Sequence, residues 1–322
     1  MKHAILGAGA VGGLIGAALA HEGHHVTVLV RPESLARHPS QLCLERPSGK
    51  IEAPIRLDTK LSTDVDVLWI TVKAHQLVPA LKAIPSHGPR IATIVPLLNG
   101  MEHVKLLRSR FDYDRVVPAT ISVESERLAP GRVVQRSSFV RLALSVTGEH
   151  KLEGVAARLR QAGFSCEFQA NEKTMLWSKL AFLAPFALSG TASDKDKQGI
   201  FDDPPWRGRL ECAVGEACAV AAADGATVDR EKILAMLESL PAAMRTSMQK
   251  DVSAGRMPEL DAIGGPIIRA GRHHGLDVPT TRELVARIEE RLNKRFPQDT
   301  SPVRISKKTR YIRALSTRTA PD

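Results

Sequence analysis

The chain begins with the run Ile5-Leu6-Gly7-Ala8-Gly9-Ala10-Val11-Gly12-Gly13-Leu14-Ile15-Gly16, in which an apolar strand leads through a Gly-x-Gly-x-x-Gly turn into a small-residue helix. Each glycine of the motif has its own physical role. Gly7 lets the chain turn off the strand, Gly9 lets the backbone approach a pyrophosphate, and Gly12 lets the helix pack against the sheet. The phosphates then lie at the positive end of the helix dipole. Such a turn is unspecific alone, but between a strand and a helix it predicts a dinucleotide-binding domain.

A second strand sharpens this prediction. The run His25–Val30 alternates and is rich in β-branched residues, and Arg31 follows it. In NAD-binding domains an Asp or Glu at this strand end usually binds the adenosine ribose, whereas a guanidinium fits a 2′-phosphate. Such a charge-assisted contact contributes about 1.5–3 kcal/mol. Arg31 therefore predicts NADP(H) rather than NAD(H); the alternative is a solvated arginine at a strand end.

Length and composition indicate a globular protein with two domains. The chain has 322 residues, of which 43% are hydrophobic and 25% charged. A signal peptide is not expected, because the first apolar run holds five glycines that we interpret as phased for nucleotide binding: Gly7, Gly9, Gly12, Gly13 and Gly16. No apolar run is long enough for a membrane span. We therefore expect a cytoplasmic protein with no membrane association.

The spacing of the cysteines and the net charge indicate which ligands the protein is expected to bind. The four cysteines show no metal-ligand spacing, so we expect reduced thiols and no metal site. The net charge of +10 favours anionic partners, and the segment 297–322 contributes six basic and two acidic residues. An anionic cofactor and substrate explain a basic site, and with few aromatic residues nucleic-acid binding is not expected.

Two kinds of pattern divide the chain. Strands and helices alternate up to about Gln169, which is typical of a doubly wound sheet. The expected strands after the first two are 65–72, 90–98, 115–123, 132–135, 140–145 and 165–169, and the expected helices between them are 75–84 and 151–162. Beyond Asn171 the pattern is helical, with helices expected at 173–187, 206–224, 230–250, 258–273 and 280–296.

These patterns predict an α/β protein in which a Rossmann-like doubly wound domain (1–170) is followed by an all-helical substrate and catalytic domain (171–296) and a basic, flexible tail (297–322). The expected place for a substrate is the cleft between the two domains.

Lys179 is the most informative polar residue of the helical half. Its neighbours from Met175 to Leu183 are almost all apolar. Partial burial would lower its pKa toward the working pH of a general acid. The alternative is a lysine on the polar edge of an amphipathic helix.

Two carboxylates and a hydroxyl are candidate partners for this lysine. Glu259 follows Pro258 at a predicted helix start, Asp261 comes two residues later, and Ser247 offers a hydroxyl to substrate. For each residue a structural role at a helix end remains an alternative.

Together these segments resemble the ketopantoate reductase (2-dehydropantoate 2-reductase) family over roughly residues 3 to 295. The resemblance rests on the order of the glycine turn, Arg31, Thr71-Val72-Lys73-Ala74-His75-Gln76, Leu98-Asn99-Gly100, Trp177-Ser178-Lys179-Leu180, Thr246-Ser247-Met248-Gln249 and Glu259-Leu260-Asp261.

The resemblance implies NADPH-dependent reduction of a small anionic 2-oxo acid, ketopantoate to pantoate. The implied cofactor-binding residues are Gly7, Ala8, Gly9, Ala10, Val11, Gly12, Arg31, Lys73, Asn99 and Glu259. Lys179 becomes the general acid and Glu259 orients substrate and lysine, while Asn99 and Ser247 bind substrate. A homodimer is left open.

The chain departs from the family pattern where asparagines usually help bind the 2-oxo acid. Leu183, Ala187 and Gly264 stand at those positions. A different 2-oxo acid is therefore an alternative substrate, and a non-catalytic NADPH-binding regulator is a second alternative.

Overall fold

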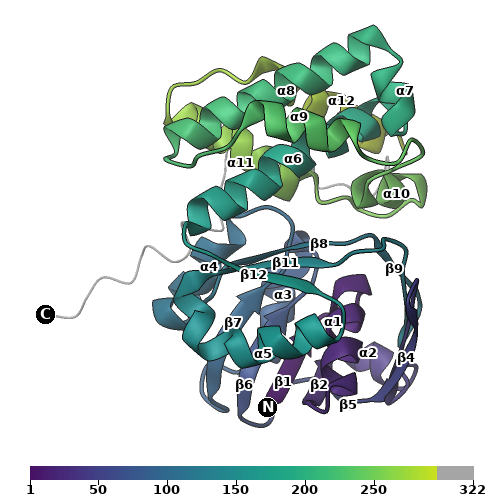
Figure 1. Ribbon diagram of the computed structural model, residues 1–322, viewed down its shortest axis with the longest axis vertical. Helices are drawn as coiled ribbons and strands as arrows, with labels where there is room; N and C mark the ends of the chain where they lie inside the picture. The colour runs from purple at the N-terminus through teal and green to yellow at the C-terminus, as the bar shows by residue number, and fades with distance from the viewer. Residues whose placement is uncertain (296–322) are drawn as a thin grey trace, which may run out of the picture. The chain divides into compact units, whose positions relative to one another are not determined.

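The computed structural model describes residues 1–295, which form two compact units (Figure 1). The first comprises Met1–Leu98 and His103–Met175; the second comprises Asn99–Glu102 and the chain from Leu176 onward. The four residues Asn99–Glu102, which follow the strand Ile91–Pro96, thus belong with the helices. The expected tail at 297–322 lies outside the described residues.

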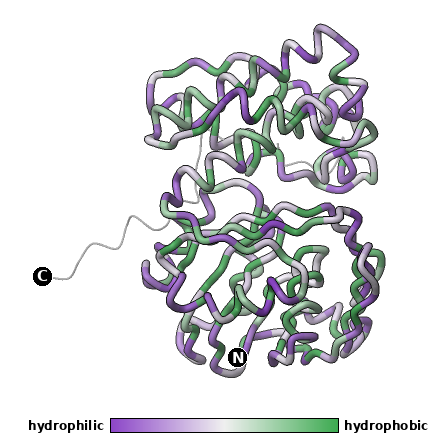
Figure 2. The backbone as a smooth tube through the Cα atoms, in the orientation of Figure 1, coloured by the Kyte–Doolittle hydropathy of each residue, from purple (hydrophilic) through white to green (hydrophobic). Residues whose placement is uncertain are grey.

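A five-stranded parallel sheet forms the centre of the first unit, in the order β5-β2-β1-β6-β7. Its strands are β1 (Lys2–Leu6), β2 (His25–Leu29), β5 (Arg56–Asp58), β6 (Val65–Ile70) and β7 (Ile91–Pro96). Strands β1, β6 and β7 are largely buried on both faces and are mostly apolar (Figure 2). The edge strand β5 is partly exposed.

Helices cover both faces of this sheet. Ile5, Val67 and Trp69 pack in one core with α1 (Ala10–His21) and α5 (Glu149–Gln161). The alternate residues Ala4, Leu68 and Ile70 pack in the other core with α3 (Leu77–Ala80) and α4 (His103–Arg110). The predicted Rossmann-like fold is confirmed.

A second sheet packs on the outer side of α1. It runs β4-β3-β10-β9 and consists of β3 (Gln41–Arg46), β4 (Gly49–Pro54), β9 (Ser125–Ala129) and β10 (Arg132–Gln135). A Cβ atom on Gly13 would lie 2.5 Å from Cγ2 of Val133, and one on Gly16 would lie 2.9 Å from Cδ1 of Leu42. We interpreted these two glycines as phased for nucleotide binding; the structure shows that they let a sheet approach the helix.

The later strands do not extend one doubly wound sheet, as the sequence had suggested. The strands β8 (Ala119–Ser122), β11 (Arg141–Ser145) and β12 (Ser165–Gln169) form a third sheet, in which β8 runs antiparallel to β11. The β9–β10 hairpin turns at Gly131, whose φ of +74° suits a glycine. A direct hairpin therefore joins β9 to β10, whereas α5 forms the crossover between the parallel strands β11 and β12.

The second unit is helical. Its helices are α6 (Glu172–Ser193, whose first turn lies in the first unit), α7 (Lys197–Phe201), α8 (Pro204–Ala223), α9 (Arg230–Glu238), α10 (Ser247–Ser253), α11 (Leu260–His273) and α12 (Pro279–Arg295). The single helix expected at 230–250 was wrong. Pro241 cannot donate a helical hydrogen bond, and Thr246 starts a new helix with a capping box to Gln249.

Proline also interrupts the helix expected at 75–84. That segment is η1 (Ala74–Gln76), α3 and η2 (Leu81–Ala83), with Pro79 inside α3. The remaining short elements of the first unit are α2 (Pro32–Leu35), η3 (Tyr113–Arg115) and η4 (Val146–Gly148).

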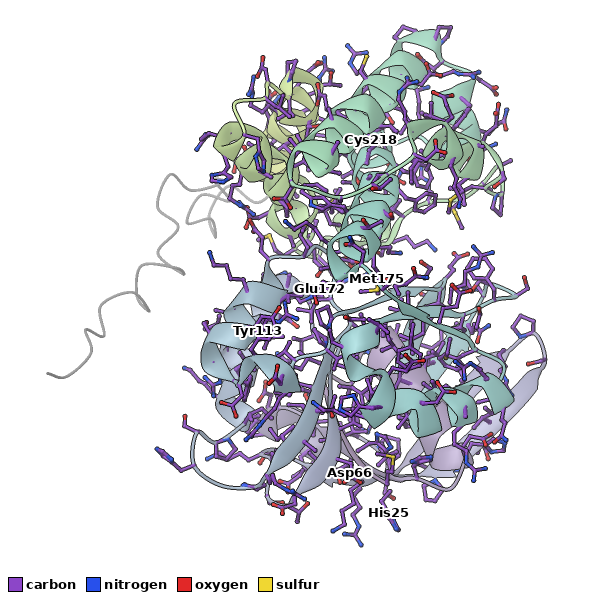
Figure 3. The ribbon with its side chains drawn as sticks, turned by 60° about the vertical axis from the view of Figure 1, so that its left-hand side comes forward. His25, Asp66, Tyr113, Glu172, Met175 and Cys218 are labelled. Atoms are coloured by element: carbon purple, nitrogen blue, oxygen red, sulfur yellow. The ribbon has the colours of Figure 1, made fainter. Side chains whose placement is uncertain are left out.

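An arginine anchors the start of α6 within the first unit. Arg108 of α4 donates from Nη1 and Nη2 to the two carboxylate oxygens of Glu172, at 2.6 and 2.9 Å. Its guanidinium also lies 3.9 Å from the ring centroid of Tyr113, which Figure 3 labels together with Glu172. The bidentate pair fixes where α6 begins.

Candidate active site

The glycine turn leaves the sheet directly after β1. Gly7 has a φ of +117°, and a Cβ atom there would lie 2.9 Å from the backbone nitrogen of Val72. Thr71 holds the turn from the adjacent strand end, because its Oγ1 donates to the carbonyl of Gly7 at 2.8 Å. Thr71 was quoted in the family motif but received no role from sequence; the structure makes it a support of the turn.

Gly9 and Gly12 have different surroundings. At Gly9, the N-cap of α1, a Cβ atom would meet only the Thr71 carbonyl oxygen, at 4.0 Å, whereas at Gly12 it would lie 2.0 Å from the Gly7 carbonyl oxygen. Gly12 is therefore required by packing within the turn. Gly9 has space beside it, and among the described residues no side chain caps this helix end.

The turn Gly7–Val11 is the partly accessible link between a buried strand and a buried helix, and it includes Ala8 and Ala10. Backbone N–H groups at an uncapped helix N-terminus, with no acidic side chain in the first turn, form a favourable environment for an anion.

Arg31 and Lys73 follow the two strands that flank β1. Leu6 pairs in register with Leu29 of β2 and with Ile70 of β6, so the residues after these strands leave the same edge of the sheet. The Arg31 side chain is 78% exposed and forms a 3.3 Å ion pair with Glu33. An exposed pair of this kind is weak. Lys73 is partly accessible and directly follows the segment that contacts Gly7.

Lys179 lies on α6 in the second unit. Ser178, Lys179, Phe182 and Leu183 are partly accessible, whereas Trp177, Leu180 and Ala181 are buried in the helical core. The accessible side chains around Lys179 are thus largely apolar. The alternative, in which Lys179 lies on the polar edge of an amphipathic helix, would require polar side chains there. Burial lowers the pKa of the Lys179 ammonium from 10.5 to about 8, because desolvation disfavours its charged form.

Asn99 and Glu259 are two predicted site residues that the structure brings together. The Nδ2 atom of Asn99 donates a 2.9 Å hydrogen bond to Oε2 of Glu259. Glu259 is the N-cap of α11, but its carboxylate makes no capping bond within the described residues. The carboxylate is therefore directed to Asn99 and not to its own helix.

Asp261, in contrast, belongs to an ion-pair network. Its Oδ1 accepts a 2.6 Å hydrogen bond from Nη1 of Arg269, and its side chain is 61% exposed. We considered this carboxylate as a partner of Lys179; the structure shows it paired with an arginine that the sequence reasoning missed.

Ser247 is the exposed first residue of α10. The neighbouring Gln249 is buried, and its Nε2 donates to the carbonyls of Gly190 and Lys195 at 2.9 and 2.8 Å. The capping box and Gln249 thus tie the start of α10 to the end of α6, and this fixes the position of Ser247.

The positions that depart from the family pattern are apolar in the structure. Leu183 is partly buried and Ala187 is fully buried. A Cβ atom on Gly264 would lie 2.7 Å from Cγ2 of Val285. A side chain at position 264 would therefore need the Val285 side chain of α12 to shift.

Within residues 1–295, no set of three His, Cys, Asp or Glu side chains could hold a metal ion. Over the same residues, every helix is too short or too polar to cross a membrane.

Family profiles match both halves of the chain. The profile described as ketopantoate reductase PanE/ApbA matches residues 3–146, and that of the ketopantoate reductase PanE/ApbA C terminal matches residues 171–291. The 2-dehydropantoate 2-reductase of Caulobacter vibrioides is 31% identical over 293 residues, which cover 88% of this chain and 96% of the relative. The enzyme of the same name from Mycobacterium tuberculosis is 31% identical over 294 residues, covering 88% and 95% of the two chains.

Solved structures show the same architecture. The PanE/ApbA family ketopantoate reductase from Ralstonia eutropha superposes with a TM-score of 0.83 at 26% identity, covering 92% of this chain and all of that one. A D-mandelate dehydrogenase solved with NADH shares the fold, with a TM-score of 0.79 at 23% identity and coverage of 91% and 99%. The chain therefore belongs to the ketopantoate reductase family, a family of NAD(P)H-dependent oxidoreductases.

Proposed function

We propose that this protein reduces a 2-oxo acid with NADPH, and that the substrate is ketopantoate, which becomes pantoate on the way to pantothenate and coenzyme A. The observation that carries the proposal is Lys179, a lysine in an apolar strip of α6 whose pKa is lowered to about 8. A binding protein without catalysis has no need for such a costly residue.

The glycine turn fits a dinucleotide pyrophosphate. Gly9 leaves space beside the uncapped start of α1, where the backbone of Gly7–Val11, with Ala8 and Ala10, would bind the phosphates. Arg31 and Lys73, from strand ends on either side of β1, would bind the adenosine end and its 2′-phosphate.

Lys179 would protonate the reduced carbonyl. When bound, NADPH supplies the hydride for the carbonyl carbon. The Lys179 ammonium donates its proton to the carbonyl oxygen, so that the product is a neutral hydroxyl group. Because positive charge beside a developing alkoxide stabilises the transition state more than the ketone, the lysine lowers the barrier.

The remaining polar residues would bind and orient the substrate. Glu259, held by Asn99, orients substrate and lysine; both residues would also contact the nicotinamide end of the cofactor. Ser247 would donate its hydroxyl to the substrate from the start of α10.

A different 2-oxo acid is the second candidate substrate. The observation that favours it is the apolar character of Leu183 and Ala187, together with the lack of space at Gly264. The reaction would be unchanged, since these residues contribute no proton.

Cytoplasmic localisation and a homodimer complete the proposal. The localisation is supported by the cysteines, since Cys43, Cys166, Cys212 and Cys218 are all free thiols in the structure.

The proposal is tested by following NADPH oxidation against a panel of 2-oxo acids headed by ketopantoate, with NADH as the matched cofactor control. We expect turnover of ketopantoate with NADPH. If only another 2-oxo acid is reduced, the second candidate substrate is correct. If none of the 2-oxo acids is reduced, the proposal that this protein is a 2-oxo acid reductase is contradicted.

A further inference from the structure

The segment Asn99–Glu102 lies against the start of α11. Gly100 has a φ of +81°, and a Cβ atom there would lie 2.3 Å from the carbonyl oxygen of Ala262. Four residues further along the helix stands Pro266, which has no N–H to donate to that carbonyl. Glycine and proline together therefore let the segment approach the helix backbone closely.

Arg269 fastens the far end of this segment. Its Nε and Nη2 atoms donate to the two carboxylate oxygens of Glu102, at 2.7 and 2.5 Å. Its Nη1 atom donates to Asp261 in the first turn of the same helix, at 2.6 Å. The Arg269 side chain is 26% exposed, and the bidentate geometry of its guanidinium fixes the carboxylate of Glu102 in one orientation.

Gly265 makes room for this arrangement. Residues 261, 265 and 269 are four apart and lie on one face of the helix. A Cβ atom on Gly265 would lie 2.4 Å from Nη2 of Arg269 and 2.7 Å from Oδ1 of Asp261. The guanidinium therefore lies across the helix at a position where any side chain would displace it.

We propose that Arg269, lying over Gly265, is a positioning residue: it holds Asn99–Glu102 on α11 and thereby sets the Asn99–Glu259 hydrogen bond. The inference rests on the proposed function, in which that pair contacts the reactants. The segment has no regular secondary structure, and the chain enters it from the first unit and returns there, so its place on α11 depends on side-chain contacts. An error of about 1 Å in placing such a group lowers the rate by up to about 10²-fold.

Arg269→Ala tests the inference, with Arg272→Ala as the matched control because Arg272 is an exposed arginine of the same helix. We expect kcat on the best 2-oxo acid to fall on the order of 10-fold or more for Arg269→Ala, with a smaller loss of NADPH affinity. Arg269→Lys should restore part of the loss, and Arg272→Ala should behave as wild type. Unchanged kcat in Arg269→Ala would overturn the proposal.

Gly265→Ala provides a second variant, in which every charge is kept. Alanine favours helices over glycine, so the melting temperature should not fall. We expect kcat to fall all the same, because the new methyl group displaces the guanidinium. Wild-type kcat in this variant contradicts the proposal, even if Arg269→Ala does not fold.

A variant that carries both Asn99→Ala and Arg269→Ala tests whether Arg269 acts on the rate through Asn99. If Arg269 acts through Asn99, then Asn99→Ala/Arg269→Ala should be no slower than Asn99→Ala, and multiplied losses would overturn the proposal. Should the wild type reduce no 2-oxo acid, the proposed function fails and amide hydrogen exchange decides the inference. Exchange at Gly100 and Met101 should then be faster in Arg269→Ala than in Arg272→Ala, and equal exchange refutes it.

Discussion

The side-chain amide of Asn99 donates a 2.9 Å hydrogen bond to the carboxylate of Glu259, across 160 residues of sequence. Asn99 lies in the segment that follows β7, and Glu259 is the N-cap of α11. Asp, Asn, Ser or Thr at this position commonly caps its own helix, and the Glu259 carboxylate does not. Here it accepts a bond from a distant amide, so its orientation is a property of the tertiary structure.

This pair should act as a unit in catalysis. We expect Glu259→Ala to lower kcat and raise KM, and Asn99→Ala to do the same more weakly, because each change removes the hydrogen bond that orients the other side chain. The coupling between the two changes, measured as a double-mutant cycle in kcat/KM, should be about 0.5–3 kcal/mol. Additive effects would show that the two residues work independently.

Substitution of Gly12 should affect the stability of the fold, whereas substitution of Gly9 should affect cofactor binding. Gly12→Ala should destabilise the fold, because its Cβ atom would overlap the Gly7 carbonyl oxygen. Gly9→Ala should fold normally, apart from a small capping cost of well under about 1 kcal/mol, and bind NADPH weakly because the methyl group occupies the space for the pyrophosphate. Thermal denaturation and NADPH titration of both variants measure this. Normal NADPH affinity in Gly9→Ala would place the pyrophosphate elsewhere.

The proton donor should show itself in the pH profile. With a pKa of about 8, Lys179 is protonated at neutral pH, so reduction should slow as the pH rises through 8 and the reverse oxidation should accelerate. Lys179→Ala should lower kcat by about 10²–10⁴-fold with little change in NADPH affinity. A near-normal kcat in this variant would exclude Lys179 as the proton donor.

The same lysine should cost stability. Its pKa is lower in the folded state than in the unfolded state, so its burial penalty is present below pH 8 and disappears as the pH rises toward 10.5. Lys179→Met should therefore raise the free energy of unfolding at neutral pH by about 1–3 kcal/mol, allowing for the partial accessibility of the side chain. Urea denaturation of Lys179→Met and wild type near pH 7 and near pH 10 measures this increase in unfolding free energy. An equal increase at both pH values would show that it comes from better packing of methionine.

Cofactor choice should depend on Arg31. Arg31→Ala should weaken NADPH binding by about 1.5–3 kcal/mol and leave NADH binding nearly unchanged, because NADH lacks the 2′-phosphate. Arg37→Ala, which removes another exposed arginine of the same region, is the control. Equal losses for the two cofactors would contradict the 2′-phosphate assignment.

A buried histidine should make the first unit sensitive to acid. Trp69 donates from Nε1 to Nδ1 of His3 at 3.2 Å, which leaves the proton of neutral His3 on Nε2, 2.9 Å from Nδ1 of His24. Burial, followed by the charge on His24, lowers the pKa of His3 to about 3.

Below pH 6.5 the unfolded chain therefore binds a proton that folded His3 does not. Stability should fall by about 1.4 kcal/mol per pH unit from this residue, or about 2 kcal/mol between pH 6.5 and 5. His3→Asn keeps an acceptor for Trp69 and should flatten this slope in urea denaturation. His21→Asn, which replaces an exposed histidine, should leave the slope of unfolding free energy against pH unchanged. If His3→Asn also leaves this slope unchanged, His3 is not its source.

Much of the fold could be predicted from sequence, because its signals are local. A strand, a glycine turn and a helix are adjacent in Ile5–Gly16, and the change from alternating strands and helices to helices alone is visible in periodicity. The errors arose where short-range patterns are ambiguous. Pro79 and Pro241 lie in segments with helical periodicity, and the antiparallel strands after β7 resemble parallel ones in composition.

The roles of individual glycines could not be predicted from sequence. Gly13 and Gly16 cannot be told from Gly9 in the sequence, since each is a small residue in one run. The structure distinguishes them because a sheet formed by residues far along the chain packs on α1 at Gly13 and Gly16 but not at Gly9.

The kind of domain, the glycine turn, the arginine after the second strand and the lysine in its apolar helix could all be read from sequence, because each depends on neighbours along the chain. Three contacts could be found only in the folded chain: Asn99 bonds to Glu259, Asp261 pairs with Arg269, and Arg269 crosses Gly265 to reach Glu102. A hydrogen bond needs atoms within about 3 Å, and for residues distant in sequence that separation depends on how whole elements pack.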